Sequence, residues 1–290
     1  QGRGSISACN DAGMGSIVSA PHHQIPSWRF QNHGEVGNQE KVETFSICQQ
    51  RELLVFKEGG NKVAVRHPIV QETPLTIMLN GEELATLLCS PHSLEVLAIG
   101  FLVGEGILQS RDELKEVSCR PEQGVVWVDT TDGATRTDGF LRRNFASCCG
   151  KGRPGLPFLN DYEQIQPVAH TTRFTVPELV GWAALLETEA RTYWQTGGVH
   201  EAALAWGDGF IVSFEDIGRH NALDRILGHV FLNEIDTSDK AVILSCRVSS
   251  EMVTKAARIG VPLVVSQGAL TCLSIDLGEQ LGITLVGFAR

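Results

Sequence analysis

The pattern of apolar and polar residues is most regular in the C-terminal part of the chain. From residue 202 onward, short runs rich in valine, isoleucine and phenylalanine alternate with segments whose apolar residues recur every three or four positions. The short runs predict strands and the longer segments predict helices. This alternation predicts an α/β architecture, with helices packed on a largely parallel sheet. We expect strands at 202–206, 210–214, 241–245, 262–266 and 283–287. One helix is expected to end near residue 232, and two further helices are expected at 249–259 and 271–281.

The preceding part of the chain is predicted to be β-rich, with one helix. Asn80-Gly81 separates two apolar runs, and it predicts a hairpin because this pair accepts the positive φ angles of a type I′ turn. Ser90 and Pro91 then predict the N-cap and the first residue of a helix that ends near residue 104. Further strands are expected within 43–66 and 117–128.

A long helix and two irregular segments complete the predicted organisation. Thr175 predicts the N-cap of a helix over 177–194. Residues 133–161 lack a clear period and form a longer connection than most compact domains contain. The expected division is a disordered or expression-derived tail at 1–42, a β-rich subdomain at 43–132, a mobile cysteine loop at 133–161 and an α/β core at 162–290.

Composition narrows the classes of function. The 290 residues are 42% hydrophobic and 20% charged, with a formal net charge of −10. This charge argues against a general binder of nucleic acids or anionic membranes, because such proteins need a basic surface. No apolar run reaches the roughly 18 residues of a membrane span, and the N-terminus does not resemble a signal peptide. Eight cysteines in a chain with ample apolar core do not predict a disulfide framework, so we expect reduced thiols and a cytoplasmic location.

The densest candidate chemistry follows the predicted strand at 210–214. Residues 215–221 contain two carboxylates, a glycine, an arginine, a histidine and an asparagine, and a helix follows. In open α/β sheets, ligands bind at the carboxyl ends of strands, where helix N-termini present free N–H groups to anions. A purely structural alternative is that Asp216 pairs with Arg219 and that Asn221 caps the helix.

Two later strands also end in short polar loops that precede helices, at 246–251 and 266–271. If the three strands lie near one another, their loops line one rim. That rim would offer helix N-terminal amides, hydroxyl groups and Arg247 to phosphate or ribose groups, which suits a nucleotide-like ligand. Near the end of the long helix, Gly197 is either part of such a site or a simple C-cap, and His200 is either functional or a core histidine.

A cysteine pair, Cys148-Cys149, lies in the irregular segment and is followed by Lys151 and Arg153. Nearby cations lower the pKa of a thiol from its free value of about 8.5 and so favour the nucleophilic thiolate. This setting suits a sulfur carrier, although two incidental thiols in a loop are the alternative. Adjacent cysteines chelate a metal poorly and no CxxC sequence is present, so a zinc site is not expected.

Four sequence blocks resemble the FdhD family, the formate dehydrogenase accessory sulfurtransferases. The resemblance runs from about residue 73 to the end of the chain. The blocks stand in the family's order, which makes the match more specific than any one motif. They are TGGVHEAAL from Thr196, EDIGRHNALDRILG from Glu215, SSEMVTKAARIGVPLVVS from Ser249 and LGITLVGFAR from Leu281.

The resemblance implies both a fold and an activity. The fold is a cytidine-deaminase-like three-layer α/β/α core without the deaminase zinc site, preceded by the smaller β-rich portion. The activity is to accept sulfane sulfur from a cysteine desulfurase as a cysteine persulfide, and to pass it to the molybdenum cofactor in its bis-molybdopterin guanine dinucleotide form. The implied recipient is the formate dehydrogenase apo-enzyme, a GDP-like nucleotide could occupy the same site, and a homodimer is consistent with the family.

The resemblance also implies the residues of the site. Cys148 and Cys149 are the expected sulfur-transferring residues. The expected cofactor-binding residues are Gly197, Gly198, His200, Asp216, Arg219, His220, Asn221, Arg247, Ser249, Ser250, Ser266, Phe288, Ala289 and Arg290. Members of the family usually continue beyond the position of Arg290, so further residues of the site are expected past that point.

The cysteine loop departs from the family pattern. The family commonly carries CGxCG, whereas this chain reads Cys148-Cys149-Gly150-Lys151-Gly152. Alignment on the preceding serine retains the first cysteine as Cys148 and places Lys151 at the second position. We favour Cys148 as the persulfide carrier and leave the role of Cys149 open.

Two alternative functions remain. The first is a chaperone that binds the cofactor or the apo-enzyme without carrying sulfur, and the altered cysteine loop keeps this alternative open. The second is a zinc deaminase, which requires HxE and PCxxC motifs. The chain has only His200-Glu201 and no PCxxC, so the deaminase is the less favoured of the two.

Overall fold

The structure is a computed structural model that describes residues 47–56, 61–131, 165–169 and 172–290. The predicted tail at 1–42 and the predicted cysteine loop at 133–161 lie outside the described residues. Within the described ranges, no helix combines the length and the apolar character that a membrane crossing would require. The predicted boundaries between subdomains stay predictions.

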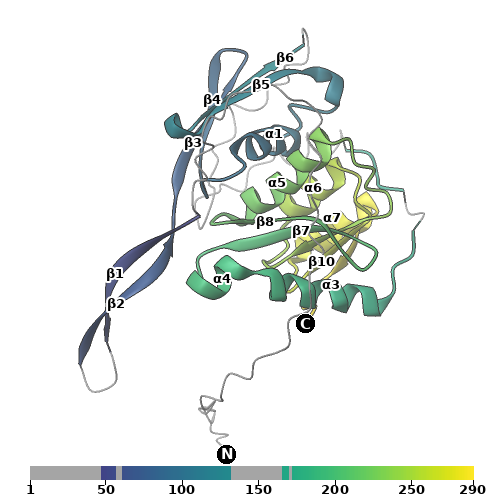
Figure 1. Cartoon of the computed structure of the whole chain (residues 1–290). Coiled ribbons are helices and arrows are strands. Elements are labelled where there is room, and N and C mark those ends of the chain that lie inside the picture. The colour runs from purple at the N-terminus through teal and green to yellow at the C-terminus, as the bar shows by residue number, and fades with distance from the viewer. Residues whose placement is uncertain (1–46, 57–60, 132–164, 170–171) are drawn as a thin grey trace, which may run out of the picture. The chain divides into compact units, whose positions relative to one another are not determined.

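The larger sheet has five strands in the order β11-β10-β9-β7-β8 (Figure 1). β9, β10 and β11 are parallel, but β7 is antiparallel to both β8 and β9, so the predicted largely parallel sheet is wrong at this edge. The reason is the tight connection at residues 207–208, because a two-residue turn can join only antiparallel strands. The strands are β7 His200–Trp206, β8 Gly209–Asp216, β9 Ala241–Leu244, β10 Leu263–Ser266 and β11 Thr284–Val286.

Helices cover both faces of this sheet. Trp182 and Leu186 of α3 (Val176–Glu189) pack on the face that carries Ala203 and Ile243. The opposite face packs against α5 (Arg219–Leu232) and α6 (Ser250–Arg258), and α7 (Cys272–Leu281) packs beside α6. An α/β architecture is therefore confirmed, and the likeness to cytidine deaminases stays a prediction.

The long helix expected over 177–194 is two helices. α3 ends at Glu189, and α4 (Arg191–Thr196) begins after Ala190, whose φ of −67° and ψ of 58° are not helical. The predicted cap is confirmed, because the backbone N–H of Thr175 donates to Oε2 of Glu178 at 2.6 Å. No glycine or proline lies at the break, and the N–H of Thr192 in α4 donates to Oε1 of Glu215 at 3.1 Å.

The β-rich part forms a four-stranded sheet in the order β4-β3-β6-β5. The predicted hairpin is confirmed, with φ of 51° at Asn80 and 85° at Gly81. The strands are β3 Thr73–Leu79, β4 Glu82–Cys89, β5 Leu114–Arg120 and β6 Val125–Thr130, with 3-10 turns at Arg111–Glu113 and Pro121–Gln123. A separate antiparallel pair is formed by β1 (Cys48–Phe56) and β2 (Lys62–Val70).

Helix α1 (Leu94–Gly104) lies between the smaller sheet and α5 (Figure 1). It begins three residues later than predicted, with Ser93 rather than Ser90 as its N-cap. Ser90 is fully buried and is bonded instead to the loop after β8. The helix start therefore depends on a tertiary contact that the sequence pattern does not show.

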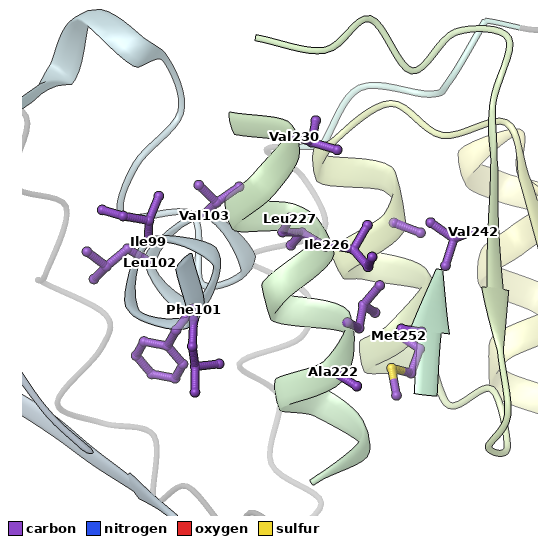
Figure 2. Packing of buried hydrophobic residues seen from close by; sticks show 14 of the residues in the cluster. Ile99, Phe101, Leu102, Val103, Ala222, Ile226, Leu227, Val230, Val242 and Met252 are labelled. Atoms are coloured by element: carbon purple, nitrogen blue, oxygen red, sulfur yellow. The ribbon is translucent and has the colours of Figure 1, made fainter. Parts of the chain in front are cut away.

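Two glycines let α1 and α5 cross in backbone contact. A Cβ atom on Gly100 would lie 1.6 Å from the carbonyl oxygen of Asp224, and one on Gly228 would lie 1.9 Å from that of Val96. Any side chain at either position would force the helices apart. Figure 2 shows the apolar residues around this crossing, where Leu102 of α1 and Leu227 of α5 belong to one buried cluster that also contains Val242 of the larger sheet.

Candidate functional site

The three polar loops predicted to share a rim do lie at one edge of the larger sheet. β9 and β10 are parallel neighbours, and β8 runs in the same direction as β9 because β7 is antiparallel to both. The carboxyl ends of β8, β9 and β10 therefore meet at this edge. β7 begins at the same edge, where His200 is paired with Asp216.

Backbone and serine hydrogen bonds join two of the loops and the C-terminal segment. Oγ of Ser266 donates to the carbonyl of Cys246 and accepts the N–H of Gly268 at 2.9 Å. The N–H of Phe288 donates to Gly268, and that of Ala289 donates to Ser266 at 3.0 Å. Ser266 is fully buried and Ala289 nearly so, so both residues build the rim rather than line its surface.

A group of cationic and imidazole side chains lies at the rim. Nε2 of His220 is 2.7 Å from Oε2 of Glu251, and this hydrogen bond lowers the pKa of Glu251. Burial and the neighbouring Arg219 lower the pKa of His200, which keeps that imidazole neutral at neutral pH. Nε of Arg219 is buried and has no hydrogen-bond partner among the residues that the structure describes, and Arg247 is exposed.

The three helix N-termini at the rim differ in how they are capped. At α7, Thr271 and Ser274 exchange backbone and side-chain hydrogen bonds, which satisfies that end. At α6 the N-cap residue Ser249 makes no side-chain cap bond, and its Oγ is buried without a partner within the described part of the chain. The N-cap of α5 is Gly218, which has no side chain to offer. The N-termini of α5 and α6 therefore retain N–H groups for an anionic ligand.

Asp216 fixes the conformation of the loop at 215–221 through hydrogen bonds. It is fully buried, and its Oδ1 accepts hydrogen bonds from the N–H of Gly218 at 2.7 Å and from Nδ2 of Asn221 at 2.8 Å. Its Oδ2 accepts the N–H of Ser90 at 3.0 Å and a guanidinium N–H of Arg225. These bonds occupy the carboxylate, so Asp216 positions the loop rather than contacting a ligand directly.

The structural alternative drawn from the sequence named the wrong partners. Asp216 pairs with Arg225, six residues beyond the expected Arg219. Asn221 does not cap α5, because its Nδ2 donates to Asp216 and to the carbonyl of Leu88 at 2.8 Å. Both side chains tie the loop to the end of β4.

Arg225 connects this loop to the segment that precedes α1. Its Nη2 donates to the carbonyl oxygens of Ser90 and His92, each at 2.9 Å, and its Nη1 donates to Asp216. Arg225 lies on α5, and its side chain is fully buried. This role could not be predicted from the sequence, because an arginine next to an apolar helical stripe is usually a solvated residue.

The remaining predicted site residues are placed as follows. Gly197, with φ of 65°, ends α4, and a Cβ on Gly198 would lie 2.8 Å from Val70, so both glycines have geometric roles. Phe288 is 68% exposed and has a φ of 55°, which is rare outside glycine, and Arg290 is exposed beside it. Ser250 is partly exposed in the first turn of α6.

The cysteine pair, Cys148 and Cys149, lies outside the described residues. Among the described cysteines, burial raises the pKa of Cys89 to about 12 and that of Cys246 to about 11. Both are therefore protonated, unreactive thiols at neutral pH. Cys272 differs because it is exposed.

Glu201 is a residue whose importance the sequence analysis missed. It is 3% exposed on β7, and its Oε2 has no hydrogen-bond partner in the described ranges. Burial, together with Glu215 and Glu189, raises its pKa to about 8. The available signal was a carboxylate inside the otherwise apolar run after His200.

The raised pKa of Glu201 predicts a pH dependence of stability. Between its ordinary value of 4.5 and about 8, the folded protein keeps this proton while the unfolded chain loses it. The unfolded state then binds fewer protons, so the free energy of unfolding should fall as the pH rises through this interval. The Glu201→Gln variant should lack the part of this fall in unfolding free energy that comes from Glu201. Urea unfolding of the original protein and of the variant, near pH 4.5 and near pH 8, measures the difference. If the unfolding free energies of the original protein and the variant differed by the same amount at both pH values, the prediction would be wrong.

Within the described ranges, no group of three or more histidine, cysteine, aspartate or glutamate side chains is arranged to hold a metal ion. The rim instead combines helix N-termini, two arginines and an exposed aromatic ring. Such an arrangement can hold a phosphate-bearing ligand.

Comparisons with known proteins give a consistent result. Residues 70–290 match the model of the FdhD/NarQ family. The sulfur carrier protein FdhD of Shouchella clausii (strain KSM-K16) is 40% identical over 248 residues, which cover 84% of this chain and 92% of that protein. The protein of the same name from Staphylococcus aureus (strain MRSA252) is 42% identical over 238 residues, covering 82% and 89%. A crystal structure from Desulfotalea psychrophila, assigned as a formate dehydrogenase accessory protein, aligns with a TM-score of 0.69 and 25% identity over 84% of this chain and 94% of that chain.

Proposed function

This chain belongs to the FdhD/NarQ family, and on that premise we propose that it is a sulfur carrier that serves formate dehydrogenase. The observation that carries the proposal is the identity of about 40% to proteins named sulfur carrier protein FdhD, over more than four fifths of the chain. The rim supports it, because its geometry suits the phosphate-bearing cargo that the proposal requires.

The proposed carrier is Cys148. Its thiolate attacks the terminal sulfur of a persulfide on a cysteine desulfurase, the S–S bond of that persulfide breaks, and the desulfurase cysteine leaves as a thiolate. The sulfur then resides on Cys148 as a persulfide. The rate of this exchange depends on the thiolate fraction and on access. The basic residues Lys151 and Arg153 favour the thiolate because they follow it closely in the sequence.

The proposed cargo is the molybdenum cofactor in its bis-molybdopterin guanine dinucleotide form, which receives the sulfur before it enters formate dehydrogenase. Its pyrophosphate groups match the free N–H groups at the N-termini of α5 and α6. Arg219 and Arg247 supply charge. Oγ of Ser249 and Nε of Arg219 have no partner among the described residues, so a ligand could bond to them. A GDP-like nucleotide presents the same groups and would occupy the same rim.

Phe288 offers a stacking surface for a guanine base. Its ring is exposed at the rim, and its left-handed backbone is held by the hydrogen bond from its N–H to Gly268. Backbone strain of this kind persists only where the surrounding structure enforces it, and it is concentrated at functional sites. His220 would orient the cargo or hold a proton, with Glu251 fixing its ring.

The test is mass spectrometry of the full chain after incubation with a cysteine desulfurase and cysteine, with peptide analysis of Cys148 and Cys149. We expect a gain of one sulfur on Cys148. A gain on Cys149 alone would move the carrier to the neighbouring residue. No gain at either cysteine would contradict sulfur transfer.

A second candidate is a chaperone that binds the cofactor without carrying sulfur. The observation in its favour is the loop Cys148-Cys149-Gly150-Lys151, which departs from the CGxCG pattern. Under this alternative a guanine nucleotide should bind at the rim even though neither cysteine accepts sulfur. In both cases we propose a cytoplasmic protein whose partners are formate dehydrogenase and, for the carrier, a cysteine desulfurase, with a homodimer as the assembly.

A further inference from the structure

An acidic cavity lies beside the edge strand β8, on the face of the sheet that α3 covers. It has a volume of about 350 Å³ and its lining includes Glu201 of β7, Glu215 of β8 and Glu189 at the end of α3, together with His92. From this cavity we infer a binding site for one ammonium or guanidinium group. The ligand is a free amine or the side chain of a lysine or arginine on a partner protein.

The site is distinct from the rim proposed to hold the cofactor. Successive residues of a strand point to opposite faces of its sheet. Ala203 of β7 packs with α3, whereas Ala202 belongs to the cluster formed with α5. Glu201 therefore faces the α3 side, while His200 faces the side of α5 with Arg219. The inference does not depend on sulfur transfer.

Within the part of the chain that the structure describes, the carboxylates of the cavity have no cationic partner. Among the described residues, none of Glu189, Glu201 and Glu215 forms an ion pair. Oε1 of Glu215 accepts the N–H groups of Thr192 and Tyr193, at 3.1 and 3.3 Å, which fixes this side chain against the start of α4. Oε2 of Glu201 is buried and has no hydrogen-bond partner among the described residues. A buried acceptor without a partner is costly unless a ligand supplies the donor.

The imidazole in the lining does not supply the missing charge. Nε2 of His92 is 2.7 Å from the carbonyl oxygen of Glu215. A carbonyl oxygen only accepts, so Nε2 carries the hydrogen. Burial and the nearby Arg225 lower the pKa of His92, so the ring is neutral at neutral pH. Ser213, which also lines the cavity, is uncharged.

A monovalent cationic group fits this arrangement better than a metal ion. The described residues contain no group of three side chains that could hold a metal together. An ammonium or guanidinium group needs several acceptors rather than a closed coordination shell, and its N–H groups can reach Oε2 of Glu201. Binding would favour the ionised form of Glu201, so it would release a proton below about pH 8.

The test uses NMR titration of the full chain, with the side-chain carboxyl carbon of Glu201 as the signal. The probes are N-acetyl-lysinamide, n-butylamine and the uncharged N-acetyl-norleucinamide. We expect both amines to bind and to lower the pH at which Glu201 titrates, and the norleucine probe to have no effect. Equal affinity of the two amines would identify a free amine as the ligand. Tighter binding of the lysine probe would identify a side chain of a partner protein.

Variants distinguish amine binding in the cavity from a general attraction of amines to the negative surface charge. Glu201→Gln keeps the shape of the side chain and should weaken amine binding at least about tenfold, in line with a lost charge-assisted hydrogen bond. Glu189→Gln should weaken it by a smaller factor, because Glu189 is exposed. Glu187→Gln is the matched control, since this exposed residue of α3 does not line the cavity. Unchanged binding by Glu201→Gln, equal binding of the norleucine probe, or binding of calcium in place of the amines would overturn the inference.

Discussion

Formate dehydrogenase matured in cells whose only copy of this protein is the Cys148→Ala variant should be as inactive as in cells that lack the protein. Alanine removes the thiol that is proposed to attack the desulfurase persulfide, and an alanine side chain cannot form that covalent intermediate. The measurement is formate oxidation by the purified dehydrogenase, with its molybdenum and guanine nucleotide content determined in parallel. We expect cofactor to be present in the inactive enzyme, because the rim that is proposed to hold it is unchanged.

The control for this variant is Cys119→Ala. Cys119 lies on β5 of the smaller sheet, and burial raises the pKa of its thiol to about 11, so it is an unreactive cysteine of the same chain. Maturation should be unaffected by this change. Normal dehydrogenase activity with Cys148→Ala would contradict the carrier role. If a variant in which both Cys148 and Cys149 are replaced by alanine still matured the enzyme, the cofactor-binding chaperone would be the better description.

Replacing Arg225 with methionine should destabilise the protein by about 3–5 kcal/mol, the range found when one partner of a buried ion pair is removed. Methionine fills a similar volume but leaves the buried carboxylate of Asp216 without its counter-charge. It also leaves the carbonyl oxygens of Ser90 and His92 without their guanidinium donor. Because domains are stable by only about 5–15 kcal/mol, this loss would leave a marginal fold. Urea unfolding monitored by circular dichroism measures it.

A double variant shows whether the ion pair is the cause. Asp216→Asn removes the unpaired charge, so adding it to Arg225→Met should recover part of the lost stability. The control is Arg247→Met, which changes an exposed arginine and should alter stability by less than about 0.5 kcal/mol. Arg258→Met is not a suitable control, because that side chain also makes contacts. A loss below about 1 kcal/mol for Arg225→Met would contradict the role given to this side chain.

The same ion pair explains why the β-rich part matters for the rim. Ser90 and His92 precede α1, and Arg225 ties them to the loop that begins at Asp216. The close contact of α1 with α5 at Gly100 and Gly228 also joins the segment before α1 to the helix that follows this loop. The loop after β8 is therefore shaped by residues more than 120 positions away in the sequence, and Arg225→Met should disturb it even in molecules that remain folded.

Features that depend on neighbouring residues were predictable from the sequence. The hairpin at Asn80-Gly81, the cap at Thr175 and the strand and helix order after residue 202 were all confirmed. Turn chemistry, capping and periodicity are local properties, so a few residues determine them. The placement of the three polar loops at one edge also followed, because strands that run in the same direction end on the same side of a sheet.

Features that depend on which surfaces meet were decided only by the tertiary structure. The direction of β7, the partner of Asp216 and the true start of α1 each required knowledge of contacts between distant segments. Glu201 is the clearest case. Its neighbours along the chain make it an ordinary carboxylate, and only the approach of β8 and α3 buries it, sets two other carboxylates beside it and raises its pKa to about 8. Charge and burial act through space, and sequence order alone does not determine distances in space.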